Sequence, residues 1–237
     1  MQNISCGVYK NRKVLITGHT GFKGSWLAFW LTQMGADVLG YALEPDPKPN
    51  HFSMLHLPIE SVIGDIRDIA NLTRVFDRFQ PEIVFHLAAQ SLVRRSYDDP
   101  VETFKTNVMG TVNIFEACRR TSSVRAVINV TSDKCYENRE WLWGYRENDP
   151  MGGYDPYSAS KGCAELVTSA YKNSFFNLAE YGRKHNALLA SARAGNVMGG
   201  GDWAKNRIIA DMMKAVSHGK KLNIRNPLAI RPWQHVL

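Results

Sequence analysis

Short runs of apolar, often β-branched residues alternate with segments of helical periodicity along most of this chain. Strand-like runs cover residues 13–17, 37–43, 61–65, 83–88, 125–131 and 187–194. Helical spacing follows residue 24 and recurs over 68–80, 100–121 and 156–183. Strands that alternate with helices bury both faces of a parallel sheet. The order therefore predicts an α/β fold with a doubly wound parallel sheet.

The first strand and the first helix are joined by a turn with three glycines, Gly18, Gly21 and Gly24, in the segment TGHTGFKGSWL. At this spacing the first glycine permits a tight turn and the second lets backbone N–H groups approach a pyrophosphate. The third lets the helix pack close to the strand. Three spaced glycines alone are a weak signal, but here a strand precedes them and an amphipathic helix follows. The turn therefore predicts a dinucleotide-binding site.

The nature of the dinucleotide depends on the loop after the second strand. Glu44 stands about where an acidic residue would bind the ribose of NAD, although a solvated loop charge is an equal interpretation. Residues 42–50 hold no arginine cluster for a 2′-phosphate, which favours NAD over NADP. His19 and Lys23 occupy variable positions of the turn. We hypothesise that their bulk and charge adjust how firmly the cofactor is held.

A tyrosine and a lysine four positions apart, Tyr157 and Lys161, open the long helical stretch. This spacing places both side chains on one face of a helix, one turn apart. The ammonium is expected to lower the pKa of the phenol, so that the tyrosinate can take a hydroxyl proton as hydride leaves a substrate. The same spacing at Tyr9 and Lys13 precedes the first strand and is interpreted as an accident.

Composition narrows the function without deciding it. The 237 residues are 44% hydrophobic and 22% charged, as in an ordinary globular protein. No run approaches the ~18 apolar residues that span a membrane, and the first residues show no secretory signal, so we expect a cytoplasmic protein without membrane contact. The net charge of +7 comes from dispersed basic residues, which favours a solvated surface over nucleic-acid binding. Neither a metal site nor a disulfide framework is expected from four scattered cysteines without a CxxC pair, Cys6, Cys118, Cys135 and Cys163.

Four motifs resemble the extended short-chain dehydrogenase/reductase family. They are TGHTGFKGS in the turn, LAAQS (87–91), ETFKTNVMGTVNIFEAC (102–118) and YSASK (157–161). Segments 131–161 and 195–211 and the ending RPWQHVL are similar to the nucleotide-sugar 4,6-dehydratases of the family that act on CDP-glucose. The resemblance covers essentially the whole chain. It implies a Rossmann-type NAD-binding domain over 1–194 and the start of a small nucleotide-sugar-binding domain over 195–237.

The resemblance also implies a reaction, the dehydration of CDP-glucose to CDP-4-dehydro-6-deoxyglucose, in the synthesis of bacterial surface-polysaccharide sugars. Such enzymes oxidise C4, eliminate water across C5–C6 and return the hydride to C6. By this resemblance Tyr157 is the base at the C4 hydroxyl and Lys161 holds the nicotinamide ribose. Ser132 bonds the C4 oxygen and Asp133 is the acid at the C6 hydroxyl. For Lys134 two interpretations stay open, the base at C5 or a contact to substrate or phosphate.

Further contacts follow from the same resemblance. Substrate contacts are expected from Asn107, Asn196, Arg207 and Arg231, with the arginines as partners of the CDP pyrophosphate or else as surface charges. Cofactor contacts are expected, besides Tyr157 and Lys161, from Gly18, His19, Thr20, Gly21, Phe22, Lys23, Gly24, Asp65, Ile66, Leu87, Ala88 and Ala89.

The resemblance finally implies a homodimer that pairs the helices near 100–121 and 156–183. Family members continue beyond RPWQHVL, so the nucleotide-sugar region is expected to be incomplete here. The nearest alternative is a nucleotide-sugar 4-epimerase, against which the Asp133–Lys134 pair argues because epimerisation needs no elimination. A non-catalytic NAD-binding module is the alternative from another class.

Overall fold

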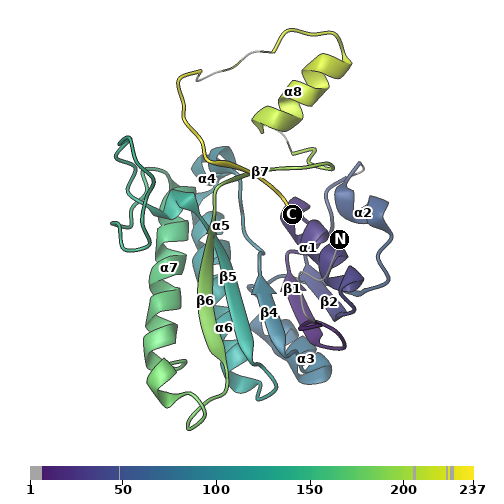
Figure 1. Ribbon diagram of the computed structural model, residues 1–237, viewed down its shortest axis with the longest axis vertical. Helices are drawn as coiled ribbons and strands as arrows, with labels where there is room; N and C mark the ends of the chain where they lie inside the picture. Colours follow the sequence, from purple (N-terminus) through teal and green to yellow (C-terminus); the bar gives the residue numbers. More distant parts are fainter. Residues whose placement is uncertain (1–6, 48, 205–206, 223, 225–226) are drawn as a thin grey trace.

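A six-stranded parallel sheet forms the centre of the computed structural model, which describes residues 7–47, 49–204, 207–222, 224 and 227–237. The strand order is β3-β2-β1-β4-β5-β6, so the chain reverses direction across the sheet between β1 and β4. The carboxyl ends of the strands face the end of the molecule where β7 and α8 lie (Figure 1). The strands are β1 (Lys13–Thr17), β2 (Asp37–Ala42), β3 (Glu60–Ile63), β4 (Ile83–His86), β5 (Ala126–Ser132) and β6 (Leu188–Ala194).

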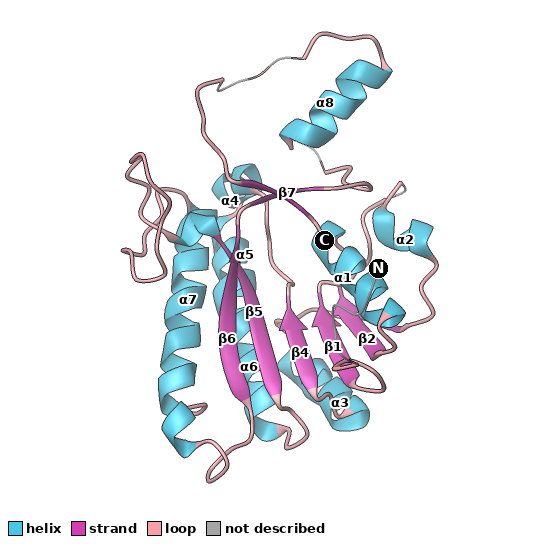
Figure 2. Ribbon diagram, viewed as in Figure 1, coloured by secondary structure: helices cyan, strands magenta, loops and turns pink. Residues whose placement is uncertain are grey.

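Helices cover both faces of this sheet (Figure 2). On one face, α1 packs on β1 and β2 through a small apolar cluster. On the other, α3, α6 and α7 pack on β1, β2, β4, β5 and β6. The predicted doubly wound, Rossmann-type α/β fold is therefore confirmed. The helices are α1 (Phe22–Gln33), α2 (His51–Leu55), α3 (Ile69–Phe79), α4 (Val93–Asp98), α5 (Pro100–Phe104), α6 (Gly110–Arg120), α7 (Pro156–Ser174) and α8 (Ile208–Ser217).

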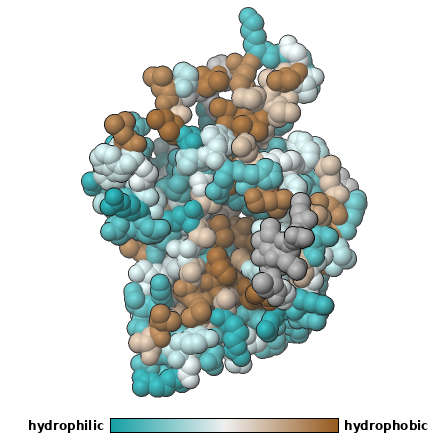
Figure 3. All heavy atoms as spheres, in the orientation of Figure 1, coloured by the Kyte–Doolittle hydropathy of each residue, from teal (hydrophilic) through white to brown (hydrophobic). Residues whose placement is uncertain are grey.

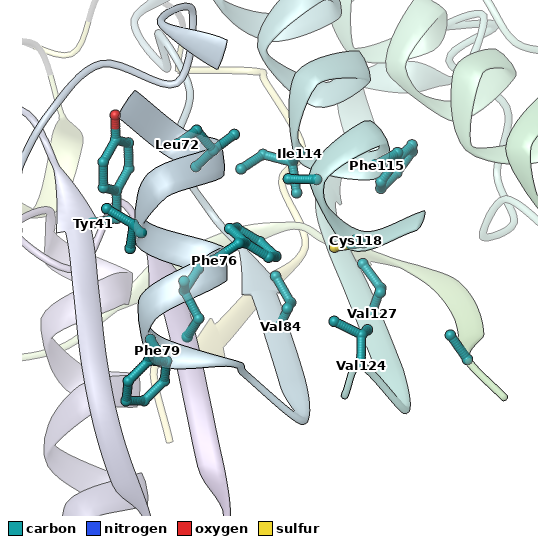
Figure 4. Close-up of a cluster of buried hydrophobic side chains, with 14 of the residues drawn as sticks. Tyr41, Leu72, Phe76, Phe79, Val84, Ile114, Phe115, Cys118, Val124 and Val127 are labelled. Carbon is teal, nitrogen blue, oxygen red and sulfur yellow. The ribbon is translucent and has the colours of Figure 1, made fainter. Parts of the chain in front are cut away.

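The larger part of the core lies beneath α3 and α6, where the side chains interlock in Figure 4. Phe76 of α3 and Phe115 of α6 are buried against Val84 of β4 and Val127 of β5. Burial of aromatic and branched side chains at this interface supplies the main stabilisation of the fold. The core thereby holds the strands in the order that brings β1 beside β4.

The predicted strands all form, within a few residues of their expected bounds, whereas the helices differ in three places. The predicted helix 156–183 was wrong over 175–183, because α7 ends at Ser174 and the chain then turns through Gly182, whose φ is +78°. The predicted helix 100–121 forms, but Lys105–Met109 is a π-helical turn between α5 and α6. The short helices α2 and α4 lack the long periodic pattern that identifies a helix from sequence.

The chain after β6 leaves the main sheet. Strand β7 (Asn196–Met198) pairs with β8 (Trp233–His235) in a separate parallel pair, and α8 lies beyond it. Hydrophobic side chains are visible at this end of the molecule (Figure 3), and Met213, Val216 and Leu228 are among the exposed ones. Among the described residues, no helix is long and apolar enough to cross a membrane.

Candidate active site

The glycine turn after β1 is built as its spacing predicts. Gly18 has φ +78°, and a Cβ there would lie 2.7 Å from the backbone nitrogen of Ala88. A Cβ on Gly24 would lie 2.1 Å from the Gly18 carbonyl oxygen, so the start of α1 touches the turn directly. Gly21 caps α1 without any side-chain hydrogen bond, and the first turn of the helix carries no acidic residue. The N-terminal N–H groups of α1 therefore remain suited to an anion.

The segment after β4 lies against this turn, as expected for Leu87, Ala88 and Ala89. Leu87 N–H donates to the Thr17 carbonyl at 3.1 Å, and Ala88 N–H donates to Thr17 Oγ1 at 3.2 Å. The carboxyl ends of β1 and β4 thus form one edge, at the point where the strand order reverses. Ligands of open α/β sheets bind at such a crevice.

The variable positions of the turn point in different directions. The His19 ring is fully buried against Gly40 of β2, and its Nε2 lies 2.7 Å from Ser61 Oγ of β3. Burial lowers the pKa of His19 to about 4, so the ring is neutral near pH 7. Thr20 Oγ1 donates to the Leu43 carbonyl at 3.1 Å, next to the exposed Glu44. Any effect of His19 on a cofactor would therefore pass through the backbone of the turn.

Lys23, on the first turn of α1, is electrostatically coupled to residues of other segments. Burial and the neighbouring Arg207 lower the pKa of Lys23, and Asp133 opposes that effect. Lys23 in turn contributes to a lowered pKa of Lys161. The cofactor turn, the end of β5 and the start of α7 therefore share one electrostatic environment. The spacing of the glycines did not predict this electrostatic coupling of Lys23.

Asp65 and Ile66, expected at the adenine end, follow β3. The Asp65 carboxylate accepts Arg67 Nε at 3.0 Å, and this contact holds the pKa of the carboxyl below its ordinary value. The Ile66 side chain is buried against Gly110 at the start of α6. Arg67 also pairs with Glu102 of α5. The segment after β3, where adenine is expected to bind, is therefore joined to α5 by an ion pair.

Strand β5 ends in the three polar residues expected to act on the sugar. Ser132 is its last residue and is buried, while Asp133 and Lys134 begin a 3₁₀ turn that ends at Cys135. Ser132 Oγ donates to Asp133 Oδ1 at 3.0 Å and accepts the Lys134 backbone N–H at 3.2 Å. The turn is therefore held by the serine that begins it, and it packs on α7.

Tyr157 and Lys161 lie on the first two turns of α7, which Asp155 caps by accepting the Ser158 N–H at 2.9 Å. Both side chains are buried. Burial raises the pKa of Tyr157, and a hydrogen bond with Ser132 opposes the rise. The pKa of Tyr157 is therefore raised, not lowered as the sequence predicted, and desolvation is the main cause. Lys161 itself has its pKa lowered to about 8, mainly by burial.

Asn107 is buried in the π-helical turn, where its amide is fully engaged. Its Oδ1 accepts the Gln90 N–H at 2.8 Å, and its Nδ2 donates to Gln90 O at 3.0 Å and to Ser160 Oγ at 2.8 Å. Ser160 donates in turn to the Tyr157 carbonyl at 2.7 Å. Asn107 therefore joins the loop after β4 to α7, and its amide is occupied by these contacts.

A buried histidine that the sequence did not single out lies at the end of β4. His86 Nδ1 is 2.7 Å from Thr17 Oγ1, and Nε2 is 3.1 Å from Thr111 Oγ1. Thr111 donates its only hydroxyl proton to the Asn107 carbonyl at 2.7 Å, so His86 Nε2 carries the ring proton. Burial lowers the pKa of His86 to about 3 and keeps it neutral. Its place at the carboxyl end of a strand is the signal that could have found it.

A second buried group, Glu165 with Arg193, was also not predicted from the sequence. Arg193 Nε lies 3.1 Å from Glu165 Oε1, and Thr131 and Ser191 also donate to this carboxylate. Burial alone would raise the pKa of Glu165, but these donors hold it below its ordinary value. Arg193 further donates to Tyr136 Oη at 2.7 Å. The pair ties α7, β5 and β6 to the segment just after Lys134.

The expected substrate contacts lie on the segment beyond β6. Asn196 starts β7, where its N–H donates to Pro232 O at 2.9 Å. Arg207 precedes α8 and bonds Asp202 at 3.4 Å, close enough to Tyr157 to influence its pKa. Arg231 is exposed, and its guanidinium donates to the carbonyl of the preceding residue at 2.7 Å. Of the two arginines, only Arg207 is tied to the site by the described contacts.

The sheet order, the glycine turn and the tyrosine–lysine pair together define a Rossmann-type short-chain dehydrogenase/reductase. The turn fits a dinucleotide pyrophosphate, because a Cβ at either of its tightest glycines would close it. Within this class the chain belongs to the family described as GDP-mannose 4,6 dehydratase, which matches residues 15–237.

Relatives and solved structures agree with this assignment. The chain is 59% identical over 231 residues to CDP-glucose 4,6-dehydratase of Salmonella typhimurium, a match that covers 97% of this chain and 64% of that protein. An epimerase structure from Methanothermobacter thermautotrophicus is similar with a TM-score of 0.82 at 26% identity, over 97% of this chain and 66% of the other. A UDP-glucose 4-epimerase from Thermus thermophilus, solved in complex with NAD, has a TM-score of 0.78 at 26% identity, over 94% of this chain and 70% of the other.

Proposed function

We propose that this chain is part of an NAD-dependent hydro-lyase that converts CDP-glucose into CDP-4-dehydro-6-deoxyglucose and water. The observation that carries the proposal is the meeting of Ser132, Asp133 and Lys134 with the buried Tyr157 and Lys161. In this group Tyr157 and Ser132 suit oxidation at C4. Asp133 and Lys134 supply acid–base groups for elimination. The 59% identity to the Salmonella enzyme supports CDP-glucose as the substrate.

Tyr157 and Ser132 act at C4 in this proposal. The phenol oxygen takes the proton of the C4 hydroxyl, and Ser132 Oγ, whose proton bonds Asp133 Oδ1 when no substrate is bound, would turn to donate to the C4 oxygen. Bound NAD would supply the acceptor for the C4 hydride and the donor for its return to C6. Lys161, one helical turn from Tyr157, is proposed to hold the nicotinamide ribose and to oppose with its charge the burial that keeps the phenol neutral.

The two residues after Ser132 are proposed to catalyse the elimination of water across C5–C6. A carbonyl at C4 acidifies the C5 proton, so groups of ordinary strength are sufficient. Asp133 protonates the departing C6 hydroxyl, and Lys134 takes the C5 proton or holds the substrate. Over one turnover a hydroxyl leaves as water, while the hydride removed from C4 is returned to C6.

NAD is the proposed cofactor, held by the turn from Gly18 to Gly24 and by the segment Leu87–Ala89 beside it. Asp65 and Ile66 would border the adenine through the backbone after β3. The Thermus thermophilus epimerase, which was solved in complex with NAD, supports this choice of cofactor. The exposed Glu44, one residue from the carbonyl that accepts Thr20, is suitably placed for the ribose.

The nucleotide sugar is proposed to bind between the two parts of the chain. Residues 1–194 would bind the cofactor, and residues 195–237 would begin the nucleotide-sugar region. Asn196, Arg207 and Arg231 are the proposed contacts, and the charge of Arg207 acts on the pKa of Tyr157. Asn107 is proposed to act indirectly, through Gln90 and Ser160.

A homodimer is proposed through the face formed by α5, the π-helical turn and α7. Val101, Met109 and Leu166 are more than half exposed there, which suits a second copy of the same helices. A cytoplasmic setting agrees with the free thiols of Cys118 and Cys135 and of Cys163. Cys6 lies outside the described residues. The product class is a precursor of deoxy sugars in bacterial surface polysaccharides, including O-antigen.

Product analysis tests the proposal. The protein is incubated with CDP-, dTDP- or GDP-glucose, with and without added NAD, and the products are separated. We expect a 4-keto-6-deoxy sugar, which absorbs near-ultraviolet light in alkali, from CDP-glucose only. A C4 epimer would instead identify an epimerase. Calorimetric binding of NAD without binding of any sugar nucleotide would identify a non-catalytic module.

A further inference from the structure

The helix that carries the cofactor turn also touches a glycine-rich segment far along the chain. Trp26, on the second turn of α1, donates its indole N–H to the Gly200 carbonyl at 2.9 Å. Gly200 belongs to the glycine loop, Gly199–Gly201, which directly follows β7. The contact joins residues 174 positions apart. It links the cofactor helix to the segment proposed for the nucleotide sugar.

His51, the first residue of α2, completes this contact. Its ring stacks on Trp26 with centroids 4.5 Å apart and planes inclined by 26°. His51 Nδ1 lies 2.8 Å from Ser25 Oγ, and Ser25 Oγ donates to the Phe22 carbonyl at 3.0 Å. Because the serine has one hydroxyl proton, the two contacts are satisfied together when His51 Nδ1 carries the ring proton. The imidazole is thereby held in one orientation.

Two of the three glycines of the loop, Gly199 and Gly201, leave no room for a side chain. Gly201 has φ +83°, and a Cβ there would lie 2.3 Å from His51 Cδ2. A Cβ on Gly199 would lie 2.7 Å from Val236 Cγ1, just beyond β8. The backbone of the loop is therefore located by Trp26 at Gly200, by His51 at Gly201 and by Val236 at Gly199.

The loop continues into the residue that orients Arg207. Asp202 Oδ1 accepts the Ala204 N–H at 3.2 Å, and Oδ2 accepts Arg207 Nη1 at 3.4 Å. Only 11% of the Asp202 side chain is exposed, against 33% for Arg207. A shift of the glycine loop would therefore move Asp202 and, with it, the guanidinium whose charge lowers the pKa values of Tyr157 and Lys23.

We propose that Trp26 and His51 are positioning residues of the nucleotide-sugar site, acting through the glycine loop and Asp202 on Arg207. The inference rests on the proposed function, in which Arg207 binds the CDP pyrophosphate. Trp26 and His51 belong to the proposed cofactor-binding region, residues 1–194. That region therefore helps to set the geometry of the proposed nucleotide-sugar region, residues 195–237.

The test compares Trp26→Phe and His51→Ala with Trp30→Phe, which changes a surface tryptophan one turn further along α1. Calorimetry measures the affinities for CDP and for NAD. Loss of one hydrogen bond or ring stack is expected to weaken CDP binding by about 3- to 10-fold in the first two variants. NAD affinity and the control should stay within about twofold of the wild type. In an Arg207→Ala background, Trp26→Phe should cause no further loss of CDP affinity.

Unchanged CDP affinity in both variants would overturn the inference, as would a full additional loss in the Arg207→Ala background. Hydrogen exchange of the backbone amides of 199–204 gives a readout that needs no ligand. Faster exchange in Trp26→Phe than in Trp30→Phe supports the positioning role, and equal exchange contradicts it. If the wild-type chain binds no CDP, the proposed function fails, while amide exchange still decides the inference.

Discussion

The buried charge of Lys161 is expected to lower the free energy of unfolding by a measurable amount. Its side chain is 7% exposed, and burial together with Lys23 lowers its pKa to about 8. An unfolded lysine titrates near pH 10.4, so between about pH 8 and 10.4 the unfolded chain binds more protons than the folded one. The charged lysine therefore destabilises the folded state below pH 8, and this cost is lost as the pH rises towards 10.4.

The magnitude follows from the two pKa values. A change from about 10.5 to about 8, at 1.36 kcal/mol per pKa unit, corresponds to about 3 kcal/mol at pH 7. At pH 9.5 most unfolded chains still carry the charge on Lys161 and most folded chains do not. The destabilisation of the folded state then falls to about 1 kcal/mol. Lys161→Met keeps the length of the side chain and removes the charge. The free energy of unfolding of the variant should therefore exceed that of the wild type by about 3 kcal/mol at pH 7 and by about 1 kcal/mol at pH 9.5.

Urea unfolding followed by circular dichroism at the two pH values measures this difference. Lys172→Met is the matched control, because Lys172 is exposed on the last turn of the same helix. The control should show the same free energy of unfolding relative to the wild type at both pH values. The reasoning is refuted if Lys161→Met is less stable than the wild type at pH 7, or if its advantage does not shrink with rising pH. A confirmed result would mean that the fold retains Lys161 for its chemistry, at a cost in stability.

Three further outcomes follow from the site. Gly24→Ala places a carbon 2.1 Å from a carbonyl oxygen of the turn and should weaken NAD binding by about tenfold or more. Gly144→Ala, with nothing within 4 Å, should leave calorimetric affinity unchanged. Tyr157→Phe should slow formation of the 4-keto product by about 10²- to 10⁴-fold without changing the affinity for CDP. Equal rates would remove the tyrosine from the mechanism. Arg193→Leu leaves a buried carboxylate without its cation and should cost about 3–5 kcal/mol of unfolding free energy in urea. Adding Glu165→Gln should recover part of that loss, and no recovery would show that the ion pair is not its source.

Local pattern was sufficient to predict the fold class, the glycine turn and the tyrosine–lysine pair. Period-2 and period-3.6 hydrophobicity depends on the geometry of a single strand or helix, so it is readable within a short window. The Tyr157–Lys161 pair and the glycine turn are local in the same sense, since each lies within one helix or one turn. Errors appeared where local preference is weak, as at the end of α7, where capping and packing decide.

Contacts between distant segments could not be read in this way. His86 meets Thr17 and Thr111 only because β1 lies beside β4 and α6 packs over them. Glu165 meets Arg193 because α7 lies over the β5–β6 edge. Their residue types are those of ordinary surface or core positions. Only the packed structure distinguishes them, because burial is what makes an unpaired polar group costly and a paired one specific.

The sequence by itself predicted the parallel sheet and the dinucleotide turn, because each depends on spacing along a few turns of chain, whereas the residues expected to act on the sugar came from the resemblance of whole motifs to a known family. The tertiary structure alone decided how these parts share one site. It raised the pKa of Tyr157 by burial, brought Lys23 within the electrostatic influence of Asp133 and Arg207, and placed the glycine loop against Trp26 and His51. The physical reason is the same throughout. Spacing fixes which side chains share a face, whereas desolvation and contact depend on which faces the fold brings together.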